Sequence, residues 1–119
     1  MRPFLATVVL TLIAGCVSPA TQARITEVLS LEGEVAAGEE LWSIHCSSCH
    51  GVDGSGGTEI GLLEITRTEE RLVEIVVDGL HDMPSFGDRL SDHEIAHLLS
   101  FLDVTLGVVG DENEGGHEH

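Results

Sequence analysis

Two cysteines and a histidine stand in the order Cys-x-x-Cys-His, at Cys46, Cys49 and His50. In this spacing both thiols can add to vinyl groups at one edge of a porphyrin, and the histidine that follows can bind the iron from one face. A zinc site would need further ligands with their own spacing, and a redox-active dithiol would need a preceding strand, so both are weaker alternatives. The motif predicts one covalently attached haem c, with Cys46 and Cys49 as the thioether residues and His50 as an iron ligand.

Met83 is the leading candidate for the second axial ligand, and it is the only methionine apart from Met1. Pro84 disfavours helical backbone at the residue before it, which places Met83 in an extended loop that can present its thioether to iron. A lone methionine in a small core is otherwise packing material, and His81 is a competing ligand two residues earlier. We expect His50 and Met83 to be the axial ligands of the haem iron.

The N-terminal residues have the pattern of a secretory signal. One positive charge precedes an apolar stretch, residues 4–13, that is too short to span a bilayer as a helix. An Ile-Ala-Gly-Cys sequence ending at Cys16 then resembles a bacterial lipoprotein signal; the alternative is an ordinary signal peptide cleaved nearby, for instance after Ala20. We expect residues 1–15 to be a lipoprotein signal peptide, Cys16 to be lipidated and residues 16–34 to be a flexible, lipid-anchored tether.

Lipidation of Cys16 would place the chain on the periplasmic side of a bacterial membrane. Val17 is not the Asp that in many such lipoproteins specifies retention in the inner membrane, and this favours the outer membrane. The three cysteines are then all accounted for, one by lipid and two by haem.

Acidic residues dominate the composition. The chain has 21 Asp and Glu residues against 5 Lys and Arg residues, and its formal net charge is -16. This charge excludes a nucleic-acid backbone or an anionic bilayer as an electrostatic partner. A charged protein partner should therefore be basic, although acidic residues spread along a chain also serve as a solubilising surface.

Three stretches show the apolar spacing of helices. The first begins at Val35 and includes Ile44, the second follows a capping-box sequence at Thr66–Glu69, and the third follows another at Ser91–Glu94. The third stretch has an apolar stripe made of Ile95, Leu98, Leu99 and Leu102. The pattern predicts an all-α domain over residues 35–106, and the polar composition of residues 107–119 predicts a disordered acidic tail.

Four segments resemble motifs of the class I cytochrome c family, and they occur along the chain in the same order as in that family. They are Cys46–Gly51, Asp53–Gly57, Gly79–Phe86 and Leu90–Leu102. The resemblance implies an all-α, cytochrome c-like fold in which three main helices wrap around one covalently attached haem. It also implies that the first and last helices cross at Gly38 and Trp42 against Leu98 or Phe101, and that His50 and Met83 are the axial ligands.

Two features depart from the family. No proline occurs between Pro19 and Pro84, whereas relatives commonly have one after the haem motif whose carbonyl orients the ligand histidine. The tyrosines that often contact the haem propionates are also absent. The remaining candidates for that contact are Arg67, Arg71, Arg89 and Trp42.

Together these patterns predict a bacterial, lipoprotein-anchored member of the family that transfers single electrons through one haem. We expect an electron carrier and not an enzyme, with redox proteins of a respiratory or periplasmic electron-transfer chain as partners and with no small-molecule substrate. One alternative is a haem relay subunit of a larger membrane oxidoreductase. Another is a haem gas sensor with an open sixth site, for which rapid binding of carbon monoxide to the reduced protein would be diagnostic.

Overall fold

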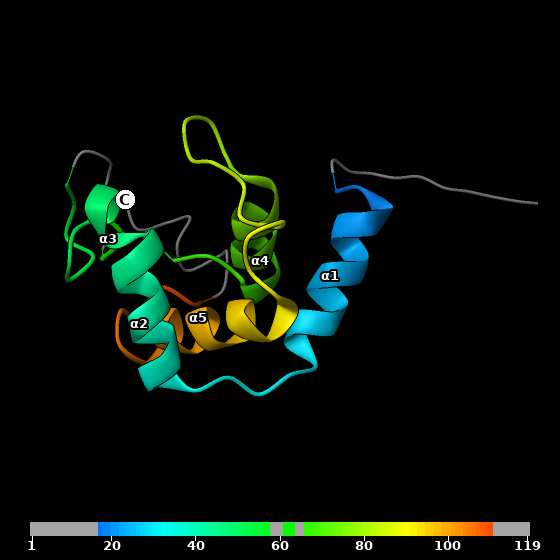
Figure 1. Cartoon of the computed structure of the whole chain (residues 1–119), viewed down its shortest axis with the longest axis horizontal. Coiled ribbons are helices and arrows are strands. Elements are labelled where there is room, and N and C mark those ends of the chain that lie inside the picture. Colours follow the sequence, from blue (N-terminus) through cyan, green and yellow to red (C-terminus); the bar gives the residue numbers. More distant parts are fainter. Residues whose placement is uncertain (1–16, 58–60, 64–65, 111–119) are drawn as a thin grey trace, which may run out of the picture.

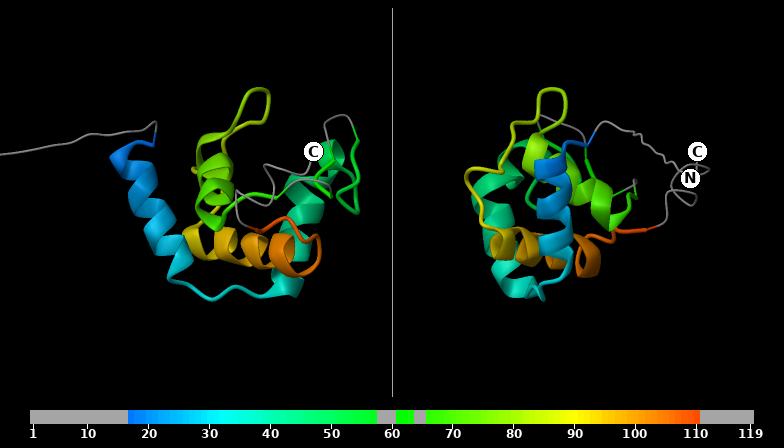
Figure 2. Two further views of the ribbon diagram at one scale, coloured as in Figure 1. Left: turned by 180° about the vertical axis from the view of Figure 1, so that it is seen from behind. Right: turned by 90° about the vertical axis from the view of Figure 1, so that its right-hand side faces the viewer.

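The computed structural model describes residues 17–57, 61–63 and 66–110, and the regular elements in these parts are five helices. The helices are α1 (Pro19–Leu29), α2 (Val35–His45), α3 (Ser47–His50), α4 (Glu69–Asp78) and α5 (Asp92–Val104). Figure 1 shows α5 as a horizontal helix against which α2, α4 and α1 are packed, and the view from behind in Figure 2 shows the same arrangement. The predicted all-α class is therefore confirmed, with α2, α4 and α5 at the predicted positions.

α2 and α5 cross at close range. Gly38 of α2 is buried, and a Cβ atom added there would clash with the carbonyl oxygen of His97 and stand 2.8 Å from the Cβ of Phe101. Glycine is the residue that lets two backbones approach this far. One turn later, Trp42 is 2% exposed and packs against Phe101, with 5.6 Å between the ring centroids. The helix crossing that the resemblance implies is thus present.

α4 and α5 each begin at a capped residue. The side chain of Ser91 accepts a hydrogen bond from the N–H of Glu94, and the carboxylate of Glu94 accepts one from the N–H of Ser91, so the predicted capping box of α5 is confirmed. α4 is capped by Thr68, which accepts from the N–H of Arg71. The sequence pattern placed the cap of α4 at Thr66. The observed cap is Thr68, two residues later.

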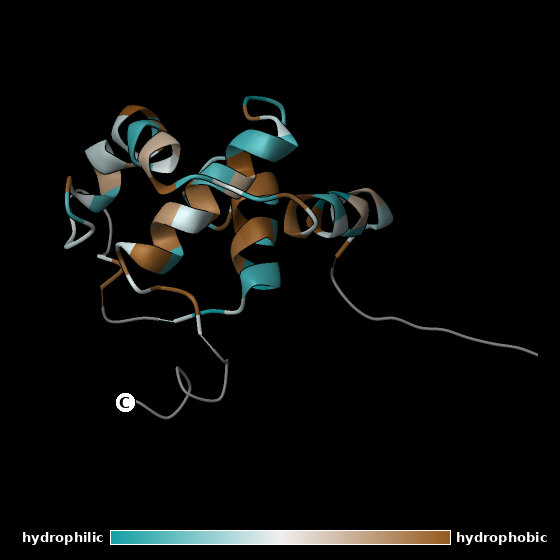
Figure 3. Ribbon diagram, turned by 90° about the horizontal axis from the view of Figure 1, so that it is seen from below, coloured by the Kyte–Doolittle hydropathy of each residue, from teal (hydrophilic) through white to brown (hydrophobic). Residues whose placement is uncertain are grey.

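The core lies between the apolar faces of the packed helices. Figure 3 shows bands of hydrophobic residues on α4 and α5. Those that are buried are Leu72, Val73, Val76 and Val77 on α4, and Ile95, Ala96, Leu98, Leu99, Phe101 and Leu102 on α5. Their removal from water supplies the main stabilisation of the helix packing.

α1 lies inside the segment predicted to be a flexible tether, and for residues 19–29 that prediction is wrong. The helix starts at Ser18, whose side chain accepts from the N–H of Thr21, and Pro19 occupies its first turn. Ile25 is 3% exposed and Val28 is 1% exposed, and α1 packs against α4 and α5. Burying each of these side chains contributes about 1.5–3 kcal/mol, which explains why the segment folds onto the domain.

The domain also extends further at its C-terminal end than predicted. Val108 is 1% exposed. The N–H of Arg67 donates to the carbonyl of Val108 at 2.9 Å, and the N–H of Gly110 donates to the carbonyl of Arg67 at 2.9 Å. Residues 108–110 are therefore part of the packed domain, and the prediction of a disordered tail is wrong for them.

Some predicted segments lie outside the described residues. They are the signal peptide over residues 1–15, the lipidated Cys16 and residues 111–119 of the acidic tail. Of the helices that are described, none is long and apolar enough to cross a bilayer.

Candidate haem-binding site

The Cys-x-x-Cys-His motif lies at the end of α2 and in α3. Cys46 follows the last residue of α2, and its carbonyl accepts hydrogen bonds from the N–H groups of Cys49 at 3.2 Å and His50 at 3.0 Å. A single helical turn therefore holds both thiols and the imidazole in one short unit. Cys46 is half-buried and Cys49 is exposed. Both sulfur atoms lie on one short turn, as attachment to one edge of a haem requires.

The environment of the Cys46 sulfur disfavours a thiolate. Burial, and to a smaller extent the neighbouring Cys49, raises the pKa of Cys46 to about 11. A redox-active dithiol acts as a thiolate and relies on a lowered pKa. Moreover, no three His, Cys, Asp or Glu side chains among the described residues are gathered as a metal-ion site requires. The site therefore gives the zinc and dithiol alternatives no support.

The indole of Trp42 ties the motif to the helix crossing. Its Nε1–H donates to the carbonyls of Gly51 at 3.2 Å and Val52 at 3.0 Å, the two residues that follow His50. The indole and imidazole centroids of Trp42 and His50 are 6.0 Å apart, with their planes at 30°. The carbonyl of His50 also accepts from the N–H of Gly56 at 2.7 Å. These contacts fix the path of the chain as it leaves the motif.

Trp42 is also one of the four candidate contacts for a haem propionate. The indole has one hydrogen-bond donor, and this N–H already donates to the backbone carbonyls of Gly51 and Val52. A guanidinium group has five N–H donors, and Arg67, Arg71 and Arg89 therefore remain candidates. The structure thus removes Trp42 from the set.

Met83 lies in a tight turn that follows α4. Gly79 ends α4 with φ +81°, and Leu80 and Met83 exchange two backbone hydrogen bonds of 3.1 and 2.8 Å. His81, inside this turn, is exposed and has φ +55°, a conformation that is uncommon for residues other than glycine. Met83 itself is half-buried against the core. The turn thus gives Met83 a defined backbone position, while the competing ligand His81 stays at the surface.

A ring contact connects the Met83 turn to the cysteine motif. Phe86 is 6% exposed, and its N–H donates to the carbonyl of Val76 at 2.8 Å. The imidazole of His45, the residue before Cys46, meets the Phe86 ring edge-on, with 5.7 Å between centroids and 72° between planes. The sequence pattern does not reveal this contact, and the position of His45 directly before Cys46 is the only signal for it.

Figures 1 and 2 show α3 and the loop that follows α4 on the same side of α5. The structure therefore brings the segments of Cys46, Cys49, His50 and Met83 to one side of the helix packing. Ligation of the iron by His50 and Met83 stays a prediction.

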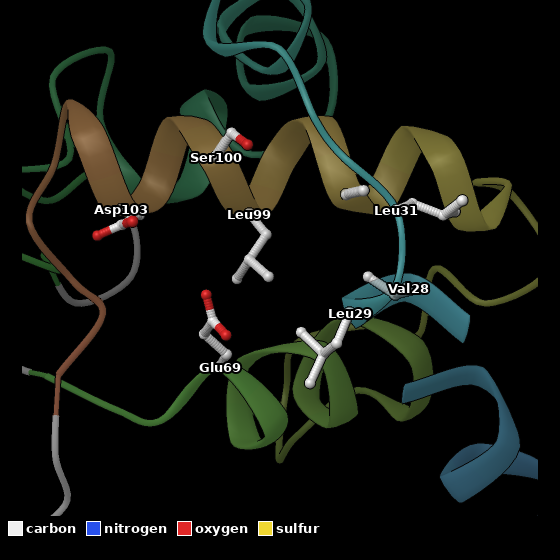
Figure 4. Close-up of a pocket in the computed structure, with 8 residues that line it drawn as sticks. Val28, Leu29, Leu31, Glu69, Leu99, Ser100 and Asp103 are labelled. Atoms are coloured by element: carbon white, nitrogen blue, oxygen red, sulfur yellow. The ribbon is translucent and has the colours of Figure 1, made fainter. Parts of the chain in front are cut away.

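A separate pocket lies between α1, α4 and α5, and Figure 4 shows the carboxylate of Glu69 pointing toward Leu99 in it. Its volume is about 100 Å³. It is lined by Val28, Leu29, Leu31, Glu69, Ala96, Leu99, Ser100 and Asp103. Since no residue of the Cys-x-x-Cys-His motif lines it, this pocket is distinct from the candidate haem site.

Comparison with known proteins identifies the family. Residues 33–102 match the family model described as cytochrome C oxidase, cbb3-type, subunit III. The chain belongs to this cytochrome c family. The match includes α2 to α4, most of α5, the Cys-x-x-Cys-His motif and Met83, whereas α1 precedes it.

Some relatives of this cytochrome match over nearly their whole length, and others match over only a part of it. Cytochrome c6 from Diacronema lutheri is 32% identical over 78 residues, which is 59% of this chain and 94% of that protein. The cbb3-type cytochrome c oxidase subunit FixP from Rhizobium etli is 29% identical over 91 residues, or 70% of this chain and 32% of that protein. The chain thus spans nearly all of a cytochrome c6 but about a third of the oxidase subunit.

A solved structure confirms the fold. The crystal structure of cytochrome cL from Hyphomicrobium denitrificans has a TM-score of 0.54 and 20% sequence identity, and the likeness covers 71% of this chain and 58% of that one. The predicted cytochrome c-like fold with three main helices is therefore confirmed. With the single Cys-x-x-Cys-His motif, family membership also confirms haem c as the covalent cofactor of this mono-haem cytochrome.

Proposed function

We propose that this cytochrome carries single electrons between redox proteins on the periplasmic side of a bacterial membrane, to which a lipid on Cys16 anchors it. The proposal is supported chiefly by the Cys-x-x-Cys-His turn, which is held against the helix crossing on the same side of α5 as the Met83 turn. The covalently bound haem supplies a one-electron redox centre. His50 and Met83 would stay in place in both oxidation states, because each is presented by hydrogen-bonded backbone.

The ligand assignment is tested on the full chain produced in a host with haem-attachment machinery. The protein should be red, its mass should include one haem, and the reduced form should bind carbon monoxide slowly or not at all. Met83→Ala should open the sixth position and bind carbon monoxide rapidly. His81→Ala is the matched control, because it removes the competing ligand from the same turn and should leave the spectrum unchanged.

Two results would overturn this assignment. Rapid, stoichiometric binding of carbon monoxide by the unmodified protein would mean an open sixth site and would favour the gas-sensor function. A low-spin spectrum that persists in Met83→Ala and is lost in His81→Ala would transfer the ligand role to His81.

The lipid anchor is supported by the position of α1. The N-cap of this helix is Ser18, two residues after Cys16, so lipidation would leave the helix whole and hold the domain close to the bilayer. Cleavage after Ala20 would instead remove the N-cap and the first residues of α1. We propose the outer membrane as the site of anchoring, because Val17 does not match the inner-membrane retention signal.

Membrane fractionation tests the anchor. The unmodified protein should be found in the membrane fraction with a mass that includes acyl chains. Cys16→Ser should lose both properties and keep its haem, since Cys46 and Cys49 are unchanged. An unmodified protein that is soluble and starts at Thr21 would contradict the proposal.

A second candidate function is that of a fixed haem relay in a membrane oxidoreductase. It is favoured by the family model and by FixP, a relative that is named as an oxidase subunit. Purification in a mild detergent distinguishes the two functions. A free carrier should elute alone, whereas a relay subunit should elute with its partners in constant ratio.

A further inference from the structure

One turn of α1 contacts both ends of the loop that carries Met83. The hydroxyl of Thr21 donates to the carboxylate of Asp78, the last residue of α4, at 2.8 Å to Oδ1 and 3.1 Å to Oδ2. Arg24 donates through Nε to Oδ1 of Asp92, the first residue of α5, at 2.7 Å. The loop between Asp78 and Asp92 is therefore tied to α1 at its beginning and at its end.

Arg24 also binds the backbone within this loop. Its Nη1 donates to the carbonyl of Gly87 at 2.5 Å, and its Nη2 donates to the carbonyl of Leu90 at 3.0 Å. Because the guanidinium is planar and rigid, three bonds in different directions fix the loop segment relative to α1. Lysine carries a single ammonium on a flexible stem and could not reproduce this set of bonds.

The contact between Thr21 and Asp78 compensates for an unfavourable position of the carboxylate. Asp78 lies at the C-terminus of α4, where the helix dipole is negative and disfavours an anion. Thr21 is 5% exposed, so its hydroxyl needs partners, and it accepts from Ser18 at 3.1 Å while donating to Asp78. This hydroxyl is thus a buried donor that is directed at the start of the loop.

The Met83 turn has few bonds of its own. Among the described residues, the backbone groups of Leu80 and Met83 bond to each other, and the next backbone contact to α4 is made by Phe86. The position of Met83 therefore depends on how firmly the two ends of the loop are held. α1 holds both ends of the loop in place. This helix lies before residue 33, where the match to the family model begins.

We propose that α1 is a brace for the iron ligand, in which Thr21 and Arg24 are positioning residues that keep the Met83 loop closed over the haem. This inference rests on the proposed ligation of iron by Met83. An external ligand such as imidazole can bind the iron only when the loop opens and Met83 leaves. Its apparent affinity therefore reports the population of the open loop directly.

The test compares variants of the full, haem-loaded chain. Thr21→Val removes the hydroxyl at nearly constant shape, and Arg24→Met removes the three donors but keeps an apolar stem. Thr26→Val is the matched control, because Thr26 is exposed on the same helix and bonds only to the carbonyl of Gln22 in its own helix. Thr21→Ser is the conservative variant that restores the hydroxyl.

Imidazole binding to the ferric protein is measured by optical titration. The near-infrared charge-transfer band of ferric haem with a methionine sulfur as axial ligand, called here the thioether band, is recorded in the same samples. Thr21→Val and Arg24→Met should each raise the imidazole affinity about tenfold, the change expected when a charge-assisted hydrogen bond no longer holds the closed loop. Thr26→Val and Thr21→Ser should stay within about twofold of the unmodified protein. The helical circular dichroism should be the same in all of them.

The outcomes separate this inference from the proposed function. If the unmodified protein lacks the thioether band, ligation by Met83 fails, and the brace fails with it. If the band is present and Thr21→Val and Arg24→Met bind imidazole like Thr26→Val, the brace is overturned while ligation by Met83 stands. Should Arg24→Met not fold, the comparison of Thr21→Val with Thr21→Ser decides the question alone.

Discussion

Gly38→Ala tests the helix crossing on which the haem site is built. The new Cβ would clash with the carbonyl oxygen of His97 and stand 2.7 Å from its carbonyl carbon. To bring the carbonyl carbon alone to an ordinary contact of 3.4 Å, the backbone of α5 would have to withdraw by about 0.7 Å, and the closer oxygen requires a larger shift; packed cores resist such shifts. Overpacking of this kind costs about 1–3 kcal/mol or more, and the obstacle here is backbone that cannot rotate away.

Helix propensity acts in the opposite direction, which makes the sign of the result informative. Alanine in place of glycine within a helix is favourable by about 1 kcal/mol. We expect the clash to dominate and the net loss to be about 2 kcal/mol, which for a domain of this size lowers Tm by roughly 8–16 °C. Without a close crossing, Gly38→Ala would stabilise the protein.

The assay is thermal unfolding of the haem-loaded protein, followed by far-ultraviolet circular dichroism and by haem absorbance. Ala36→Gly is the matched control, because Ala36 is exposed on the same helix and its replacement changes propensity alone, by about 1 kcal/mol. A Gly38→Ala variant whose Tm equals or exceeds that of the unmodified protein would refute the reasoning.

The contacts around this crossing lead to further expected outcomes. Ser91→Ala removes the capping box of α5 and should lower the free energy of unfolding by about 1 kcal/mol in urea denaturation; an unchanged midpoint would contradict it. Trp42→Phe keeps an aromatic ring but removes the donor to Gly51 and Val52 and leaves a smaller side chain at a buried site, and should cost at least about 1 kcal/mol by the same measurement. Because the chain has a net charge of -16, its electron-transfer rate with a basic partner should fall as salt is added, whereas the rate with a neutral small-molecule reductant should not.

Apolar periodicity made α4 and α5 predictable, but it was a poorer guide to α2. All four residues of the predicted α5 stripe are buried. In α2, Ile44 follows the apolar spacing and yet is 66% exposed, while Gly38 and Trp42 are buried. Glycine has no hydrophobic signal, so periodicity cannot mark it as a contact point. The position of the crossing came from the family resemblance alone.

α1 was missed because its stability depends on distant parts of the chain. The sequence has a helix start at Ser18 and Pro19, but the first turn has no acidic residue. A helix of 11 residues is marginal in water by itself. Its partners in α4 and α5 lie 57 and 68 residues further along the chain, as the bonds of Thr21 and Arg24 show. Local patterns do not record such contacts.

The same distinction separates the chemistry of the site from its positioning. Thioether formation requires particular atoms at short spacing, so the haem-attachment motif with Cys46 and Cys49 was predictable from the sequence, whereas iron ligation by His50 stays a prediction. The bonds that tie the Met83 loop to α1 arise only when distant segments pack together, because Arg24 lies 63 to 68 residues before the residues it contacts. Substitution of a motif cysteine should therefore weaken covalent haem attachment, whereas Arg24→Met should leave attachment intact and change only how readily the sixth ligand is lost. We therefore expect Arg24→Met to yield red, haem-loaded protein with a changed affinity for imidazole. If the short motif alone determined the properties of the site, this variant would bind imidazole like the unmodified protein.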